Sequence, residues 1–253
     1  MIKRDALLEY CDELLKSRLF RDYCPNGLQV EGREEIHSLV TGVTASQALI
    51  DAAIESQADA ILVHHGYFWK GENPCITGIK RRRLKALLDA EISLFAYHLP
   101  LDAHDIYGNN IQLAQRLQIV PQGSFGGSYG EPDLARFGEF ATDMSVMEVE
   151  ERIFQILGRP VQHIAGGPQQ IKRVGWCTGA AQSYIEDAAG LGLDAFISGE
   201  ISEQTVHVAR EYGLHYFAAG HHATERYGVM ALGEHLAKKH TISAKFIDID
   251  NPA

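Results

Sequence analysis

Cysteine is scarce in this sequence, and no two cysteines have a metal-binding or redox spacing. Cys11, Cys24, Cys75 and Cys177 are scattered through 253 residues. Without a C-x-x-C pair, the chain carries neither a zinc ribbon nor a thioredoxin-like motif. Isolated cysteines are typical of a reducing compartment, so we expect a cytoplasmic protein.

Long apolar runs and positive charge are scarce as well. No run approaches the roughly 20 apolar residues of a membrane helix, and the first ten residues are too charged for a signal peptide. We therefore expect no membrane partner. The net charge of −10 disfavours a general nucleic-acid-binding surface. The single basic run, at 80–85, is typical of the solvated face of a helix.

Two common catalytic motifs are absent. The glycine-rich stretch at 121–132 lacks the G-x-x-x-x-G-K-[ST] pattern of a phosphate-cradling loop. No serine lies in a G-x-S-x-G elbow, so a serine hydrolase is not supported. We interpret the glycine-rich stretch as a connection between two lobes, followed by a small subregion with a helix.

Short apolar strands alternate with helical patterns along the chain, which predicts an α/β fold with largely parallel sheets. The runs that predict strands are near 36–44, 59–64, 92–98, 171–178, 194–198, 214–219 and 245–250. The patterns that predict helices are near 3–17, 45–57, 78–90, 109–117, 145–157, 180–191, 202–212 and 223–239.

The chain also repeats itself. Residues 40–65 align with residues 175–200 without gaps, and the identical pairs include Ala45 with Ala180, Gln47 with Gln182, Ala53 with Ala188, Asp59 with Asp194, and Ala60 with Ala195. We therefore predict two related α/β lobes, at 1–122 and 123–253. The final strand, near 245–250, is a candidate for pairing with the first lobe.

Three groups of possible metal ligands follow predicted strands: His64-His65, the H-x-x-x-D segment His98–Asp102, and the H-x-x-x-E segment His221–Glu225. Ligands of parallel α/β sheets bind outside the carboxyl ends of the strands, so the three groups predict one metal site. Nitrogen and oxygen donors without thiolate suit Zn, Fe, Mn, Co or Ni.

Five or six donors exceed the needs of one tetrahedral zinc ion and match a pair of divalent ions. Such a pair lowers the pKa of a bound water, which indicates hydrolysis of a phosphate, amide or ring C–N bond.

A family resemblance rests on these segments. Residues 64–72, 98–104 and 220–226, together with Pro25–Gly32, resemble the signatures of the NIF-three-like family, closest to its short bacterial YbgI-type members. Members of the family are often named GTP cyclohydrolase I type 2 homologues. The resemblance covers essentially the whole chain. It implies two interlocked α/β lobes with a dinuclear metal site between them, and a ring-shaped homohexamer. The metal ligands it implies are His64, His65, Asp102, His221 and Glu225.

Four further residues have alternative interpretations. The repeat makes His98 the partner of His221, whereas the family pattern omits it, so it is either an occasional ligand or a residue outside the ligand set that contacts substrate. His222 either contacts substrate or bonds to backbone. Glu200, which aligns with His65, is a general base, a residue that orients a ligand, or the cap of helix 202–212. Lys70 either contacts a substrate phosphate or belongs to a subunit contact.

The function expected from these observations is that of a dinuclear metal-dependent hydrolase of a nucleotide or a related small molecule. The cyclohydrolase name rests on the family alone. The alternative is a non-enzymatic metal-binding or partner-binding assembly protein.

Overall fold

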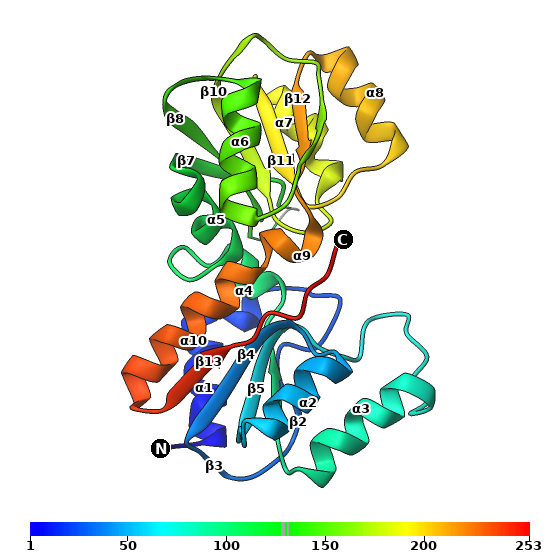
Figure 1. Cartoon of the computed structure of the whole chain (residues 1–253), viewed down its shortest axis with the longest axis vertical. Helices are drawn as coiled ribbons and strands as arrows, with labels where there is room; N and C mark the ends of the chain where they lie inside the picture. The colour runs from blue at the N-terminus through cyan, green and yellow to red at the C-terminus, as the bar shows by residue number, and fades with distance from the viewer. Residues whose placement is uncertain (128–129, 131) are drawn as a thin grey trace. The chain divides into compact units, whose positions relative to one another are not determined.

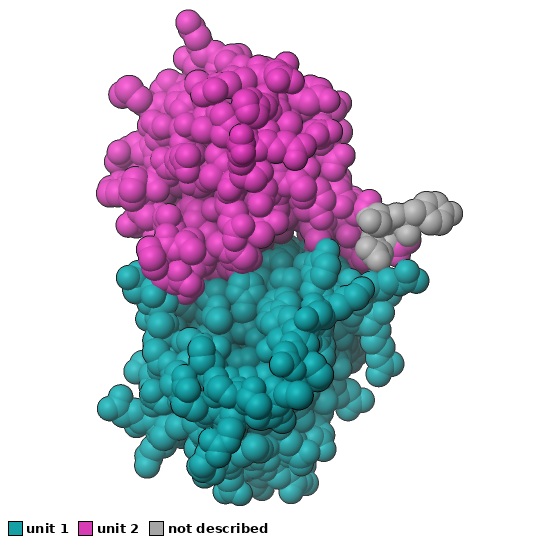
Figure 2. Space-filling view, turned by 90° about the vertical axis from the view of Figure 1, so that its right-hand side faces the viewer, with its two compact units in different colours: residues 1–108, 228–250 teal, residues 109–227, 251–253 magenta. Residues whose placement is uncertain are grey.

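The computed structural model describes residues 1–127, 130 and 132–253. They form two compact units (Figure 1): residues 1–108 with 228–250, and residues 109–227 with 251–253. Figure 2 shows the first unit in teal and the second in magenta. The chain passes from the first unit to the second between residues 108 and 109, whereas the sequence predicts a lobe boundary between residues 122 and 123. Residues 228–250 then return to the first unit.

A five-stranded sheet forms the centre of the first unit. Its strand order is β13 (Ser243–Phe246), β4 (Ser38–Thr44), β5 (Ala60–His65), β6 (Ser93–Ala96) and β2 (Gly27–Val30). β2 pairs antiparallel with β6, and the other neighbours are parallel. A separate two-stranded sheet consists of β1 (Ile2–Lys3) and β3 (Glu35–Ile36).

Helices cover both faces of this sheet. On one face, α2 (Gln47–Glu55) and α3 (Gly78–Asp89) bury Leu49 and Leu87 against the strands. On the other face, α1 (Arg4–Leu15) and α10 (Arg226–His240) bury Leu7 and Leu232. The 3-10 turn Ser17–Leu19 follows α1, and the short helix α4 (Leu99–Ala103) follows β6. Because side chains alternate along the strands, β5 supplies residues to both cores.

The second unit has a six-stranded sheet, again covered on both faces. Its strand order is β7 (Ile119–Phe125), β8 (Ala135–Ser145), β10 (Gln170–Cys177), β11 (Ala195–Ser198), β12 (His215–Ala218) and β9 (Gln162–Ile164). Helices α5 (Asn109–Leu117) and α6 (Val146–Leu157) cover one face. The other face carries α7 (Ile185–Gly190), preceded by the turn Gln182–Tyr184, and α8 (Glu203–Tyr212). The short helix α9 (His221–Thr224) follows β12.

The expectation of largely parallel sheets is wrong for the second unit. Only β10–β11 and β11–β12 are parallel among its described pairings, while β7–β8, β8–β10 and β12–β9 are antiparallel. The glycine-rich stretch at 121–132, predicted to be a connection, contributes its first part to β7. A Cβ at Gly138 of β8 would overlap the carbonyl oxygen of Val120, so glycine lets these strands approach closely. Pro121 is tolerated because β7 is an edge strand.

The internal repeat is visible in equivalent hydrogen bonds. Oδ2 of Asp59 accepts hydrogen bonds from the backbone N–H groups of His37 (2.8 Å) and Ser38 (2.9 Å). Oδ2 of Asp194 accepts them from Lys172 (2.9 Å) and Arg173 (2.7 Å), at the matching positions of the second unit. Each aspartate joins the start of one parallel strand to the strand before it.

Within the part of the chain that the structure describes, none of the helices combines the length and apolar character needed to cross a membrane.

Candidate metal centre

Three histidines of the first unit lie close together at the ends of two strands. His64 and His65 are the last residues of β5, and His98 is the N-cap of α4, just beyond β6. The His64 ring centroid lies 4.5 Å from that of His65 and 5.0 Å from that of His98. One ligand atom from each of the three lies within 4.8 Å of the others, a spacing that suits a shared metal ion.

Asp102 adds a carboxylate to this group. It lies in α4, and its backbone N–H donates to the carbonyl oxygen of His98 at 3.1 Å. This turn places its Oδ1 atom 3.5 Å from Nε2 of His64. The predicted ligands His64, His65 and Asp102 are therefore brought together within the first unit.

The Nδ1 atom of each of these histidines faces an oxygen. That of His64 lies 3.0 Å from the carbonyl oxygen of Tyr97, and that of His65 lies 3.2 Å from Oγ1 of Thr44. Nδ1 of His98 lies 2.6 Å from Oδ1 of Asp22. Burial raises the pKa of Asp22, but hydrogen bonds led by that of His98 outweigh burial and lower the pKa below its usual value.

The second unit holds His221 and Glu225 in and just after α9. Nδ1 of His221 lies 2.7 Å from Oε1 of Glu200, and its Nε2 lies 3.2 Å from Oε2 of Glu225. Burial lowers the pKa of His221, but Glu225 and Glu200 outweigh burial and raise the pKa to about 9. The imidazole is thus held between two carboxylates, one of which is the predicted ligand.

The donor chemistry of both groups fits divalent metal ions. Four histidines direct Nδ1 to an oxygen, which leaves Nε2 as the nitrogen that could bind a metal ion, an arrangement typical of ligating histidines. Carboxylates complete an N/O donor set that suits Zn, Fe, Mn, Co or Ni. Cys24 also lies near Asp22 and His98, but burial, with a smaller effect of Asp22, raises the pKa of its thiol to about 12. A cysteine ligand needs the thiolate, so Cys24 fits this role poorly.

The two H-x-x-x-D/E segments are not equivalent positions of the repeat. Ala60 pairs with Ser93 as its counterpart Ala195 pairs with His215. Ser93 and His215 are therefore equivalent positions of the repeat. At equal distances along the chain from these two residues, His98 corresponds to Gly220 and Asp102 corresponds to Thr224. The helical turns agree, since Asp102 bonds to His98 as Thr224 bonds to Gly220, both at 3.1 Å. The apparent motif copy is displaced by one residue, and the repeat does not pair His98 with His221.

The structure places the other predicted residues as follows. Glu200 does not cap α8, because Ser202 does so together with Thr205; its carboxylate faces His221. The backbone N–H of His222 donates to the carbonyl oxygen of Ala253 at 3.2 Å. Lys70 is exposed in the turn after β5, and its backbone N–H donates to the carbonyl oxygen of Tyr23.

The aromatic segment around Lys70 lies against the histidines of the first unit. The Trp69 ring meets His98 edge-on at 5.0 Å and lies 5.9 Å from the ring of His65. Nε1 of Trp69 donates to the carbonyl oxygen of Gly66 at 3.2 Å, which fixes the indole there.

Sequence reasoning missed Asp22 and Thr44 as partners of histidine Nδ1 atoms. Asp22 lies in an irregular segment with no periodic pattern, and Thr44 reads as an ordinary strand residue. The one available signal was the segment Pro25–Gly32, which contains Asn26, a hydrogen-bond partner of Asp22.

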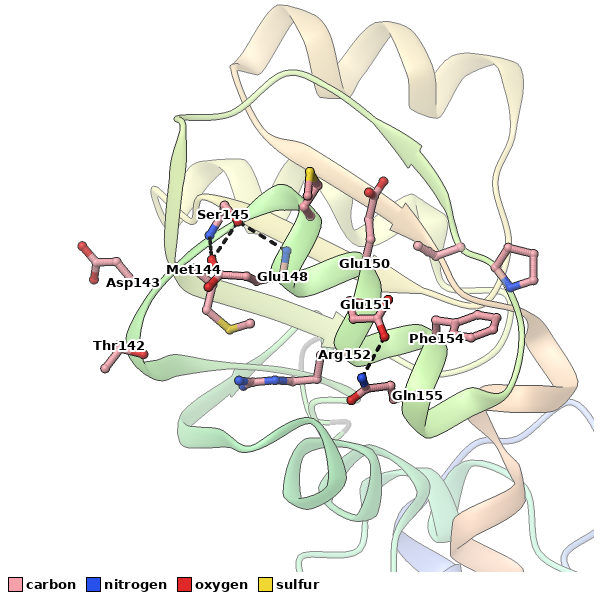
Figure 3. Close-up of a pocket in the computed structure, with 13 residues that line it drawn as sticks. Thr142, Asp143, Met144, Ser145, Glu148, Glu150, Glu151, Arg152, Phe154 and Gln155 are labelled. Atoms are coloured by element: carbon pink, nitrogen blue, oxygen red, sulfur yellow. Dashed lines mark hydrogen bonds between the residues drawn. The ribbon is translucent and has the colours of Figure 1, made fainter.

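A hollow of about 770 Å³ lies elsewhere in the second unit, along α6 (Figure 3). Its lining includes Glu148, Glu151, Arg152 and Phe154, and no residue predicted as part of the metal site is among the described residues that line it.

Comparisons with known proteins cover the whole chain. Residues 2–252 match the profile of the Duf34/NIF3 (NGG1p interacting factor 3) family. The chain is 57% identical to the "GTP cyclohydrolase 1 type 2 homolog" of Vibrio cholerae serotype O1, over 99% of this chain and 98% of that protein.

Two solved structures share the fold. Protein ybgI, described as of unknown function, has a TM-score of 0.96 and 51% identity, with 100% of both chains covered. The Thermus thermophilus protein TTHA1606 has a TM-score of 0.90 and 32% identity, again over 100% of both chains. The resemblance inferred from the histidine segments is confirmed, and the chain belongs to the Duf34/NIF3 family.

Proposed function

We propose that the protein is a metal-dependent hydrolase of a nucleotide or a related small molecule. The observation that carries this proposal is the shared anchoring of His64, His65, His98 and His221, whose Nδ1 atoms all face oxygens. Histidines anchored in this way are oriented to bind metal through Nε2. The proposed ligands are His64, His65, Asp102, His221 and Glu225, and the proposed cofactors are two divalent ions.

Donor count supports the use of both groups on the same pair of ions. His64, His65 and Asp102 offer three donors, while His221 and Glu225 offer two. Together the two sets offer five donors, which with bound water come nearer to the needs of two ions, each taking about four or more ligands, than either set alone. We propose that the two sets act together as one dinuclear centre.

Bound at this centre, the ions would supply positive charge that stabilises a developing anion and lowers the pKa of water. The surrounding residues have separate proposed roles. Glu200 holds the His221 ring through Nδ1, so it orients a ligand and is less suited to act as the general base. Trp69 offers an aromatic edge beside His65 and His98, while Lys70 and His222 are proposed substrate contacts.

The nucleotide class is proposed because relatives more than half identical to this chain carry the name GTP cyclohydrolase 1 type 2 homolog. The name specifies GTP and ring opening, whereas the donor set supports hydrolysis of several bond types. A homohexamer, implied by the family resemblance, is likewise a proposal, and native mass spectrometry of the purified protein tests it.

The test is a metal analysis followed by turnover assays. Protein stripped by chelator and reloaded with Mn, Fe or Zn is expected to bind two ions per chain and to hydrolyse a member of a nucleotide panel. His65→Ala should remove that activity, while His37→Ala, at a histidine whose side chain is 63% exposed, should retain it. Formate release from GTP distinguishes cyclohydrolase chemistry from phosphate hydrolysis.

Absence of turnover across the panel, with two ions bound, would contradict the hydrolase proposal. That result would favour the non-enzymatic alternative, a metal-binding or partner-binding assembly protein. Absence of bound metal under all loading conditions would contradict both.

A further inference from the structure

His98 lies beside the proposed ligands, yet its counterpart in the repeat is a glycine, Gly220, and the family pattern omits it. Its ring centroid lies 5.0 Å from that of His64 and 5.7 Å from that of His65. A ligand atom of His98 lies within 4.8 Å of one from each of these two histidines. Its role depends on which ring nitrogen carries the proton, and the neighbours of the ring determine that.

The Asp22 carboxylate accepts four hydrogen bonds. Oδ1 faces Nδ1 of His98 (2.6 Å) and the backbone N–H of Tyr23 (2.6 Å). Oδ2 accepts from the backbone N–H of Leu99 (2.9 Å) and from Nδ2 of Asn26 (2.9 Å). Since the other three partners are donors by their chemistry, the site is built for an ionised carboxylate, which has no proton to offer. Nδ1 of His98 must therefore supply the proton of the shared hydrogen bond.

A second contact fixes the backbone of the same histidine. Oδ1 of Asn26 accepts from the backbone N–H of His98 at 2.8 Å, while Nδ2 of Asn26 donates to Asp22. The three residues form a closed network, and the Asp22 side chain is only 2% exposed. This burial and density of donors hold the ring in one orientation, with the edge of Trp69 packed against it at 5.0 Å.

We propose that Asp22 is a positioning residue that holds His98 as the Nδ1–H tautomer, so that Nε2 of His98 is a further metal-binding atom beside His64 and His65. The first unit then offers three imidazoles and the Asp102 carboxylate. This inference rests on the metal binding in the proposed function, but not on hydrolysis.

Asp22→Asn is the most informative substitution because it preserves shape and removes one acceptor. An amide nitrogen cannot accept, so in either orientation the nitrogen side of the new amide meets only donors. The proton of His98 is then no longer held on Nδ1. Asp51→Asn is the matched control, since Asp51 is an exposed aspartate of the same unit whose carboxylate accepts from Gln47 within α2.

The first measurement needs neither a variant nor a metal. Nitrogen-15 NMR of the metal-free wild-type protein reports which nitrogen of His98 carries the proton, and we expect Nδ1–H. Asp22→Asn should reduce the population of that tautomer, and Asp51→Asn should leave it unchanged. A wild-type ring protonated mainly on Nε2 would overturn the proposal, whatever the protein catalyses.

The second measurement is the affinity for Zn²⁺ alone, by competition with a chelator. Loss of an outer hydrogen-bond partner typically weakens metal binding by about 10–100-fold, which we expect for Asp22→Asn and at least equally for His98→Ala. If Asp22 acts through His98, adding Asp22→Asn to His98→Ala should weaken binding little further. If Asp22→Asn weakened Zn²⁺ binding equally in the wild-type protein and in His98→Ala, the proposal would be overturned, because Asp22 would not act through His98.

The results separate this inference from the proposed function. Tight Zn²⁺ binding that depends on Asp22 through His98, without turnover, would support the inference and contradict the hydrolase. Turnover with Zn²⁺ affinity unchanged in His98→Ala would support the hydrolase and overturn the inference. Unfolding temperatures of the metal-free variants identify any loss that comes from misfolding.

Discussion

Gly179 lies directly against the carboxylate of Glu225. A Cβ at position 179 would overlap Oε1 of Glu225 and lie 3.3 Å from Nε2 of His221. The glycine also has a φ of +71°, a conformation that other residues adopt at a cost. The space beside the second group of donors therefore depends on the absence of a side chain.

Gly179→Ala is accordingly expected to weaken metal binding by displacing Glu225, and to lower stability by about 1–3 kcal/mol through backbone strain and overlap. The measurements are Zn²⁺ affinity and urea unfolding. Gly158→Ala is the matched control, because Gly158 has a φ of +74° and open space where its Cβ would lie. Gly158→Ala should lower stability only through backbone strain. Equal Zn²⁺ affinity in both variants would contradict the steric argument.

Glu200→Gln should weaken metal binding by about 10–100-fold without large loss of stability, because the carboxylate orients His221 through Nδ1. Chelator competition measures the effect. Glu203→Gln, an exposed position in the first turn of α8, is the comparison variant and should bind metal normally. If Glu200→Gln bound Zn²⁺ like wild type but lost activity, the orienting role would be wrong and a general-base role would gain support.

Asp59→Asn and Asp194→Asn should both destabilise the fold, because each aspartate accepts two backbone hydrogen bonds at the start of a strand. Hydrogen bonds to charged groups contribute about 1.5–3 kcal/mol each, so losses of roughly 2–4 kcal/mol are expected. Asp59→Asn should have the larger effect, since Asp59 also pairs with Arg33 at 2.9 Å. Urea unfolding of both variants tests the order, and a larger loss for Asp194→Asn would contradict it.

Stability should decrease as the pH falls below about 6.5, the ordinary value for histidine. Burial, followed by His215, lowers the pKa of His163, and burial also lowers the pKa of His104. A histidine with a lowered pKa in the folded protein contributes stability that is present above its unfolded pKa. That stability is lost as the pH falls, because the unfolded chain binds the proton more readily.

His163→Gln tests this pH dependence. His163 and His215 share a hydrogen bond of 3.0 Å, while Nε2 of His215 faces the carbonyl oxygen of Pro168. One histidine changes the slope of unfolding free energy by at most about 1.4 kcal/mol per pH unit. We expect His163→Gln to flatten the slope between about pH 7.5 and 5.5 in chelator-treated protein, and exposed His37→Gln to preserve it. An unchanged slope in His163→Gln would refute the assignment.

Sequence patterns located the strands that carry the predicted ligands because those strands are short, apolar and buried on both faces. The runs ending at His64-His65 and near Ala218 are β5 and β12 in the structure. Patterns missed β7 and β8, since glycine and proline usually mark turns, whereas here Gly138 permits close strand contact and Pro121 lies in an edge strand. Periodicity says nothing about such a contact, which depends on the neighbouring strand.

The candidate site could likewise be predicted only in part. Histidines and carboxylates after strands are recognisable as ligand types in the sequence, but their alignment within the repeat is not. Only hydrogen-bond register shows that His98 matches Gly220. The sequence does not predict the role of Asp22, because an aspartate in an irregular segment has many ordinary roles. Its partner, His98, also lies far away in the chain.

The assignment of α10 and β13 to the first unit affects how the chain is made. β13 pairs with β4, and Tyr10 of α1 bonds to His235 of α10, so these contacts join early and late segments. On the ribosome, β4 must remain an open edge until β13 has emerged, whereas the second unit can complete its sheet sooner. The unit that begins first therefore finishes last. During that interval its uncovered strand edge is a natural target for chaperones and for aggregation.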